Sequence, residues 1–220
     1  MTAVDMLCLA YSMKHGGRCV AGLNLESGEW IRPVSAAEDG TLSAASCRTD
    51  AGRPVQPLDV VRIPVGQARP APHQPENWVV AQGEWTLRDT LSVAEASPHI
   101  DAVVESGETV LGGRGRSVSW ESIQEHGVDA SLTVVRVTGP RFEVNDWNRF
   151  RARFRRGAAS YDLSCTDLAP WAAEAYRQGG VASTTDWYLT VSLGEPWEET
   201  NHCYKIVAAG IEIRERSPAS

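Results

Sequence analysis

Short runs in which apolar and polar residues alternate recur along the chain, and they predict β-strands. In the first 35 residues three such runs are joined by "MKHGGR" and "ESGE", tight connections that favour a meander of strands over a βαβ unit. The strands predicted for the first half are 6–12, 18–25, 29–35, 58–65 and 77–82.

The segments between these strands carry loop-forming residues. Residues 36–57 are polar and small, which predicts a loop with one helical turn, and "ARPAPHQPE" at 68–76 holds three prolines and is predicted to be irregular. From about residue 82 to 130 the pattern weakens: helical stretches are interrupted by Pro98, and "LGGRGRS" predicts a flexible turn. We expect an irregular, partly helical insertion there.

The second half begins with a predicted strand at 131–139 and a turn at Gly139-Pro140. The next strand is predicted to start in "RFEVND" and to continue through "RFRARFRR", with "YDLSCTD" as the strand after it. "LAPWAAEAYRQGG" predicts a helix at 168–180, capped by Asp167 or Thr166 and ended by two glycines. Strands at 186–194 and 203–213 complete the half.

This order of three strands, a helix and two strands is that of an OB-fold, a five-stranded Greek-key barrel. The first half repeats it with a loop in place of the helix. The prediction is a mostly β protein with few helices, built from two tandem OB-fold-like small barrels. We place the first barrel with its insertion (about 82–130) at 1–130, the second at 131–214, and a disordered tail at 215–220.

Composition and charge narrow the class of protein. The chain has 220 residues, 42% of them hydrophobic, and no run long enough to cross a membrane. Its five cysteines are spread out without a CxxC pair, which favours free thiols in a reducing compartment, so we expect a cytoplasmic protein without a metal site, a cofactor or a membrane partner.

The net charge of −7 argues against indiscriminate binding to nucleic acid, yet the charge is unevenly distributed. Residues 1–130 hold ten basic and 17 acidic side chains, whereas 131–220 hold 11 of each. Residues 136–156 contain seven arginines and only two acidic residues, Glu143 and Asp146. The positive charge is concentrated in one predicted strand.

In that strand arginine alternates with apolar residues: Arg149, Arg151, Arg153 and Arg155 share one face, and Phe150, Ala152 and Phe154 the other. Guanidinium groups about 7 Å apart along a strand resemble the spacing of phosphates in single-stranded nucleic acid. Equally, long arginines can simply solvate the outer face of a barrel.

Further candidates lie near the N-terminus. "KHGGR" supplies Lys14, His15 and Arg18 around two glycines, a candidate phosphate loop in the position that OB-folds use for oligonucleotides, or a plain turn. Among the eight tryptophans, Trp30 and Trp187 lie on predicted strands, and Trp30 and Arg32 are candidates for stacking on bases.

The stretches "CLAYSMKHGGRCVAG", "WIRPVS", "YDLSCTDLAPW", "YLTVSLGEPW" and "CYKIVAAGI" resemble the dual OB-containing domain (DuOB) family of prokaryotic conflict and defence systems. The resemblance spans nearly the whole chain. It implies two OB-folds in tandem and a role in sensing or binding nucleic acid, and it supplies no catalytic residues.

No catalytic motif such as GxSxG or HExxH is present. The function predicted is therefore a non-enzymatic module that binds single-stranded nucleic acid, an accessory component of a prokaryotic defence system with possible protein partners. Two alternatives stay open: a sensor of a nucleotide-like small molecule held between the barrels, or a protein–protein adaptor with an acidic first half. An enzyme using distant residues such as Asp167 and His15 is a lesser alternative.

Overall fold

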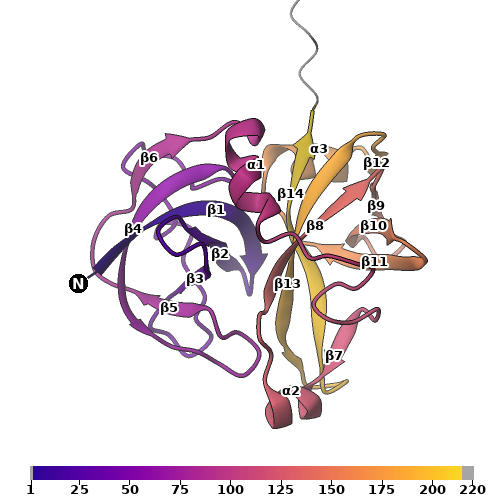
Figure 1. Ribbon diagram of the computed structural model, residues 1–220, viewed down its shortest axis with the longest axis horizontal. Helices are drawn as coiled ribbons and strands as arrows, with labels where there is room; N and C mark the ends of the chain where they lie inside the picture. The colour runs from indigo at the N-terminus through magenta and orange to yellow at the C-terminus, as the bar shows by residue number, and fades with distance from the viewer. Residues whose placement is uncertain (1, 215–220) are drawn as a thin grey trace, which may run out of the picture.

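The computed structural model describes residues 2–214 and consists mainly of β-strands, which make up 52% of the chain against 11% in three helices. This confirms the prediction of a mostly β protein. Figure 1 shows the two halves side by side, the first in indigo to magenta and the second in orange to yellow. The tail predicted at 215–220 lies outside the described residues.

Five strands of the first half close into a barrel in the order β1-β2-β3-β5-β4, with β1 and β4 also paired. A sixth strand, β6, lies on the outer edge of β4. The pairing of β3 with β5 is parallel, and the other pairings are antiparallel. These strands are β1 (Thr2–Lys14), β2 (Gly17–Asn24), β3 (Trp30–Val34), β4 (Asp59–Ala68), β5 (Asn77–Val80) and β6 (Thr86–Thr90).

The second sheet has the order β12-β9-β10-β11-β14-β13-β8, with β7 paired to β14. Its parallel pair, β11 with β14, corresponds to β3 with β5. In the described residues no strand pairing joins the two ends of this sheet as β1 and β4 do in the first half. Helix α3 (Pro170–Arg177) stands where the first half has a loop, as predicted. The strands are β7 (Ser117–Ser119), β8 (Leu132–Thr138), β9 (Arg141–Val144), β10 (Phe150–Arg156), β11 (Ala159–Cys165), β12 (Gly180–Ala182), β13 (Asp186–Trp197) and β14 (His202–Ile213).

The prediction of one continuous strand from "RFEVND" into the arginine-rich run is wrong, because a turn separates β9 from β10. The Asn145 side chain accepts hydrogen bonds from the backbone N–H groups of Trp147 and Arg149, and Asn148 adopts a positive φ of 57°. Asparagine tolerates both roles better than most residues. Arg149 therefore lies in the turn and not on the strand.

The region predicted as an insertion of the first barrel is divided between the halves. β6 joins the first sheet, whereas β7 joins the second. Helix α1 (Val93–Asp101) starts at a capping box formed by Ser92 and Glu95 and keeps Pro98 inside it, so the predicted break does not occur. Helix α2 (Trp120–His126) was not predicted.

The predicted cap of α3 is also wrong. Ala169 occupies the N-cap position, and its side chain makes no capping hydrogen bond. Asp167 is buried just before the helix, where its carboxylate accepts hydrogen bonds from the backbone N–H groups of Ala169 at 2.8 Å and Gly210 at 2.9 Å. These hydrogen bonds connect the start of α3 with β14.

Strand β1 serves both barrels, which explains its nearly unbroken apolar run. Met6 and Cys8 face the core of the first barrel, whereas Leu7 and Leu9 face a cluster shared with the second barrel and α1. Small residues allow close approach at the centre of this junction: Ala10, Ala21, Ala208 and Ala209. Beyond it, β1 bonds to the second half, where Met13 N–H donates to Thr166 O and Leu168 N–H donates to Tyr11 O.

All five cysteines are free thiols, and all but Cys19 are buried. Among residues 2–214, no helix has the length and apolar character needed to span a membrane.

Candidate nucleic-acid interface

The arginine-rich strand has the predicted alternation over residues 151–155. Arg153 and Arg155 are exposed and Arg151 is partly exposed, whereas Ala152 and Phe154 are buried in the core of the second barrel. Arg149 is exposed in the preceding turn. Three of the four arginines thus point outward from β10, an interior strand between β9 and β11, and the fourth lies in the turn before it.

Acidic side chains interrupt this row of charge. Arg151 pairs with Asp162 at 2.8 Å, and Arg153 contacts Glu143 at 2.5 Å and Asp162 at 3.2 Å. Partial burial pushes the pKa of Asp162 up, but the hydrogen bonds and charges of both arginines hold it below its ordinary value. Asp162 is therefore ionised at neutral pH and offsets part of the arginine charge.

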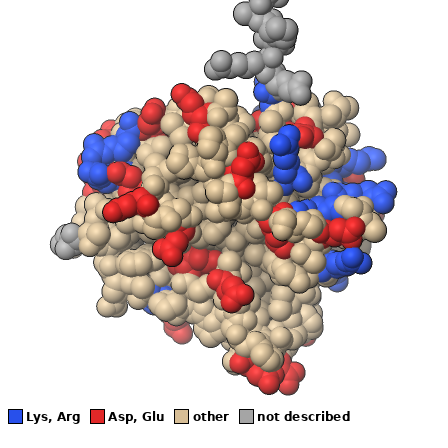
Figure 2. All heavy atoms as spheres, viewed as in Figure 1, with Lys and Arg blue, Asp and Glu red and all other residues tan. Residues whose placement is uncertain are grey.

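Arg149 and Arg155 differ from the two central arginines, because within residues 2–214 neither makes an ion pair. Figure 2 shows Lys and Arg side chains gathered at the edge of the second barrel where β9–β12 lie, interspersed with Asp and Glu. The surface is positive in places and is not a continuous basic patch.

A groove of about 1060 Å³ starts at this row and runs along the junction of the two barrels. Arg151, Asp162 and Ser164 form one wall on β10 and β11. Lys14 and His15 reach it from the β1–β2 hairpin of the first barrel. The opposite side is the β13–β14 hairpin, residues 197–200 and 204. Arg151 of the arginine row and Lys14 and His15 of "KHGGR" therefore line one groove, whereas Arg149, Arg153 and Arg155 lie outside its lining.

The β13–β14 hairpin contributes aromatic side chains that were not predicted as site residues. Trp197 is 50% exposed and packs edge-to-face on Tyr204, with ring centroids 6.3 Å apart. The guanidinium of Arg116 lies over the Tyr204 ring, with its carbon 5.9 Å from the ring centroid. The groove thus offers an exposed indole beside a cation, the pair of groups that single-stranded nucleic acid stacks on.

Lys205 was also missed, because in the sequence it looks like one polar position of a strand. It is 2% exposed at the base of the groove, and its ammonium donates to Val110 O at 2.6 Å and Gly113 O at 2.9 Å. Burial lowers its pKa to about 8. Two carbonyls hold this ammonium, so its first role is to fix the loop at 110–113.

In "KHGGR" the turn brings two side chains to a single carboxylate of the second barrel. Lys14 Nζ lies 2.8 Å from one oxygen of Glu195, and His15 Nε2 lies 2.6 Å from the other. His15 and Gly16 both adopt positive φ, 44° and 79°. Arg18 points away from the groove lining and donates to Tyr11 Oη at 3.0 Å, so it does not belong to this surface.

The stacking role predicted for Trp30 and Arg32 stays a prediction: Arg32 lines the groove, Trp30 does not, and both side chains are largely covered. Arg32 is 3% exposed, and its guanidinium donates to Ser131 Oγ at 2.8 Å and Ser192 Oγ at 3.1 Å across the junction. Trp30 packs against the clusters at the same junction. Trp187 is 6% exposed inside the second barrel, where it contacts Phe142 and Trp171. The β3 strand faces the other barrel, which a single strand's pattern does not reveal.

The fold agrees with the comparison of the sequence with known families. The profile of the dual OB-containing domain matches residues 4–210, nearly the whole chain. A search of curated proteins found no match.

Proposed function

Because the chain belongs to the dual OB-containing domain family, we propose that it binds single-stranded nucleic acid in the groove between its barrels. The observation that carries the proposal is the convergence of three elements on one groove: the arginine strand, the β1–β2 hairpin and the β13–β14 hairpin. An OB-fold binds oligonucleotides on the face of its second and third strands and on the flanking loops. In the second barrel this face is β10 and β11.

The side chains of the groove and of the arginine row have distinct parts in the proposal. Arg149, Arg153 and Arg155 lie outside the groove lining, and they contact the phosphates of a strand that extends past Arg151; Arg149 and Arg155 lack acidic partners within the described residues. Arg151 also donates to Ser164 Oγ at 2.7 Å, so it mainly holds the shape of the wall. Trp197 stacks on a base, an interaction worth about 1–3 kcal/mol per base.

The charge pattern predicts how binding responds to salt and sequence. Phosphate contacts release counterions, so affinity falls as salt rises, and contacts to the backbone carry no sequence information. With about three arginine contacts the logarithm of the binding constant should fall with a slope near −2 against the logarithm of salt concentration, at about −0.7 per contact for single strands.

A role as a non-enzymatic sensor or adaptor in a prokaryotic defence system is the broader part of the proposal, and it rests on the family resemblance. Such a module holds the strand and leaves it chemically unchanged. Incubation of labelled DNA and RNA strands with the protein and Mg²⁺ should therefore yield no shorter or modified product, and turnover would overturn this part.

Fluorescence anisotropy of labelled single-stranded DNA and RNA at two salt concentrations tests the binding itself. The variant Arg153→Ala/Arg155→Ala should bind several-fold more weakly and lower the salt slope by about 1.4, at 0.7 per contact. Trp197→Ala should weaken binding by about 5-fold or more at either salt concentration, from the stacking energy of at least about 1 kcal/mol.

The matched control is Arg62→Ala/Arg88→Ala, which removes two arginines from the first barrel. Arg62 lies on β4 and Arg88 on β6, both near Asp5. Their side chains are 44% and 46% exposed, close to the 49% of Arg153. The control should bind nearly as the wild type does. If the wild type fails to bind any strand at low salt, the proposal fails. If both double variants lose equal affinity, the arginine row is not part of the binding site, and if Trp197→Ala binds as the wild type does, neither is the groove.

A further inference from the structure

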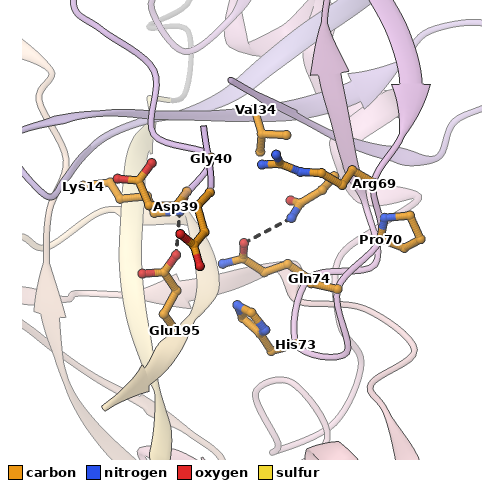
Figure 3. Close-up of a pocket in the computed structure, with 12 residues that line it drawn as sticks. Lys14, Val34, Asp39, Gly40, Arg69, Pro70, His73, Gln74 and Glu195 are labelled. Atoms are coloured by element: carbon orange, nitrogen blue, oxygen red, sulfur yellow. Dashed lines mark hydrogen bonds and ion pairs between the residues drawn. The ribbon is translucent and has the colours of Figure 1, made fainter. Parts of the chain in front are cut away.

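A second cavity lies beside the groove, on the other side of the Lys14–Glu195 pair. It has a volume of about 370 Å³, within the range of about 300–1,000 Å³ typical of small-molecule pockets. Figure 3 shows Gln74 and His73 at its centre, Lys14, Asp39 and Glu195 on one side and Arg69 and Pro70 on the other. All but Glu195 come from the first barrel.

Two amide side chains in this pocket are oriented by a relay that starts in the second barrel. Gln74 Nε2 lies 3.3 Å from Leu193 O, and a carbonyl oxygen only accepts hydrogen bonds, so the Gln74 amide nitrogen must face it. Gln74 Oε1 then faces Asn77 and accepts from its Nδ2 at 3.4 Å. The relay leaves Asn77 Oδ1 as the atom without a donor.

Asn77 Oδ1 is a buried acceptor without a hydrogen-bond partner among residues 2–214. Asn77 is 7% exposed and lines the pocket. His73 Nδ1, on the same lining, is buried and unpartnered as well. Unpaired buried polar atoms are costly and rare in native proteins, and they are expected where a ligand supplies the missing partner.

The charges around the pocket select against a phosphate. Three carboxylates line it, those of Glu38, Asp39 and Glu195, against two cations. Lys14 is already bound to Glu195 and donates to Asp39 O at 2.6 Å, and Arg69 donates to Ala37 O at 2.9 Å. Hydrogen bonds from Thr41 keep the pKa of Asp39 below its ordinary value, so that this carboxylate stays ionised.

His73 adds no positive charge at neutral pH. Burial lowers its pKa, and this outweighs the attraction of Glu195. The ring packs edge-to-face on Trp120 with centroids 5.6 Å apart, which fixes its plane at the pocket wall. A neutral imidazole offers Nδ1 as either a donor or an acceptor.

We propose that this pocket binds an uncharged nucleobase with an exocyclic amine, such as adenine or cytosine, whose amine donates to Asn77 Oδ1 and whose ring contacts His73 Nδ1. The base has two possible sources, a free nucleoside or a strand in the groove. The second source rests on the proposed function. A base of a strand bound in the groove can enter the pocket because the two share the lining residues Lys14, Gln74 and Glu195.

Isothermal titration calorimetry with adenosine, cytidine, uridine and adenosine monophosphate tests the first source. Adenosine or cytidine should bind, and uridine, which has a carbonyl in place of the amine, and the monophosphate should each bind at least ten-fold more weakly. Asn77→Leu should abolish the binding, and His73→Phe, which keeps the ring on Trp120, should weaken it. Both variants should unfold cooperatively near the wild-type melting temperature.

Anisotropy with oligo-dA, oligo-dC and oligo-dT tests the second source. If the base comes from the strand, the wild type should prefer dA or dC to dT, and Asn77→Leu should lose the preference while keeping salt-sensitive binding. Trp197→Ala separates the two proposals, because it removes a groove contact and leaves the pocket lining intact. If no amine-bearing nucleoside binds and Asn77→Leu changes no preference, the pocket proposal fails even where strand binding stands.

Discussion

Lys14 Nζ lies 2.8 Å from Glu195 Oε1, and this ion pair connects the β1–β2 hairpin of the first barrel with β13 of the second. The other carboxylate oxygen contacts His15 Nε2 at 2.6 Å. Partial burial pushes the pKa of Glu195 up, but the hydrogen bonds from Lys14 and His15 hold it below its ordinary value. The groove and the smaller pocket lie on either side of this pair.

Replacing Glu195 by glutamine should weaken the junction slightly. The pair is partly exposed, 16% for Lys14 and 31% for Glu195, so we expect a loss of about 0.5–1 kcal/mol in the free energy of unfolding. Because the pKa is lower in the folded state, the carboxylate's contribution is present at neutral pH and fades as pH falls through that pKa. Urea denaturation at pH 7 and pH 3 should show the difference from wild type shrinking in acid, and a constant difference would contradict this account.

Asp162→Asn should strengthen nucleic-acid binding. The change removes the carboxylate shared by Arg151 and Arg153 and leaves a side chain of the same size. Exposed ion pairs are worth about 0.2–1 kcal/mol, so affinity at low salt should rise by up to about fivefold. The matched control is Asp186→Asn, which frees Arg136 on β8 of the same barrel and should leave anisotropy titrations unchanged.

Glu76→Gln should destabilise the protein more than Arg32→Met does. The Glu76 carboxylate accepts from Ser131 N at 2.5 Å and Ser131 Oγ at 2.7 Å, and Ser131 in turn accepts from the buried Arg32. Loss of the carboxylate charge weakens the two hydrogen bonds that orient Ser131 toward the buried Arg32, at a cost of about 1–3 kcal/mol, whereas an apolar residue in place of a buried charge is often tolerated within about 1 kcal/mol. Chemical denaturation of both variants measures the order, and equal losses would argue against the linkage through Ser131.

Asp167 should titrate near pH 6 in the folded protein. Burial raises its pKa to about 6, although hydrogen bonds from Ala169, Gly210 and other groups oppose the shift. Between about pH 4 and 6 the folded state binds a proton that the unfolded state does not, so this group makes folding less favourable as pH rises, by on the order of 3 kcal/mol. Carboxyl ¹³C chemical shifts report the titration directly. In Asp167→Asn the stability relative to wild type should improve from pH 4 to pH 7, and a carboxyl that titrates near pH 4 would refute the shift.

The strands were largely predictable from the sequence, because period-two alternation is a local property, as the run from Phe150 to Arg155 shows. The break before β10 was missed, since it depends on the side-chain hydrogen bonds of Asn145. The short strand β7 was missed because its pairing with β14, not local propensity, defines it. The short helix α2 was missed because its place depends on Ile123 packing with Leu193 and Cys203, far away in the chain.

For the candidate site, the sequence singled out the arginines and the Lys14–His15 turn, but it did not show that Arg151 lines one groove with Lys14 and His15. Trp197 and Tyr204 join them only because two hairpins distant in the chain face one groove. The hydrogen bonds of Arg32 to Ser131 and Ser192 were unpredictable for the same reason: they come from the other half of the chain, which residue spacing within β3 does not encode.

The hydrogen bonds from the end of β1 to residues 166 and 168 have a consequence for synthesis on the ribosome. The first barrel is translated well before β14, the strand that supplies Ala208 and Ala209 to the junction. At about 5–20 residues per second this gap is on the order of ten seconds, during which the apolar side of β1 lacks its contacts from the second half, such as Tyr188 and Ile211. A nascent chain stalled in that interval should be the species most in need of a chaperone.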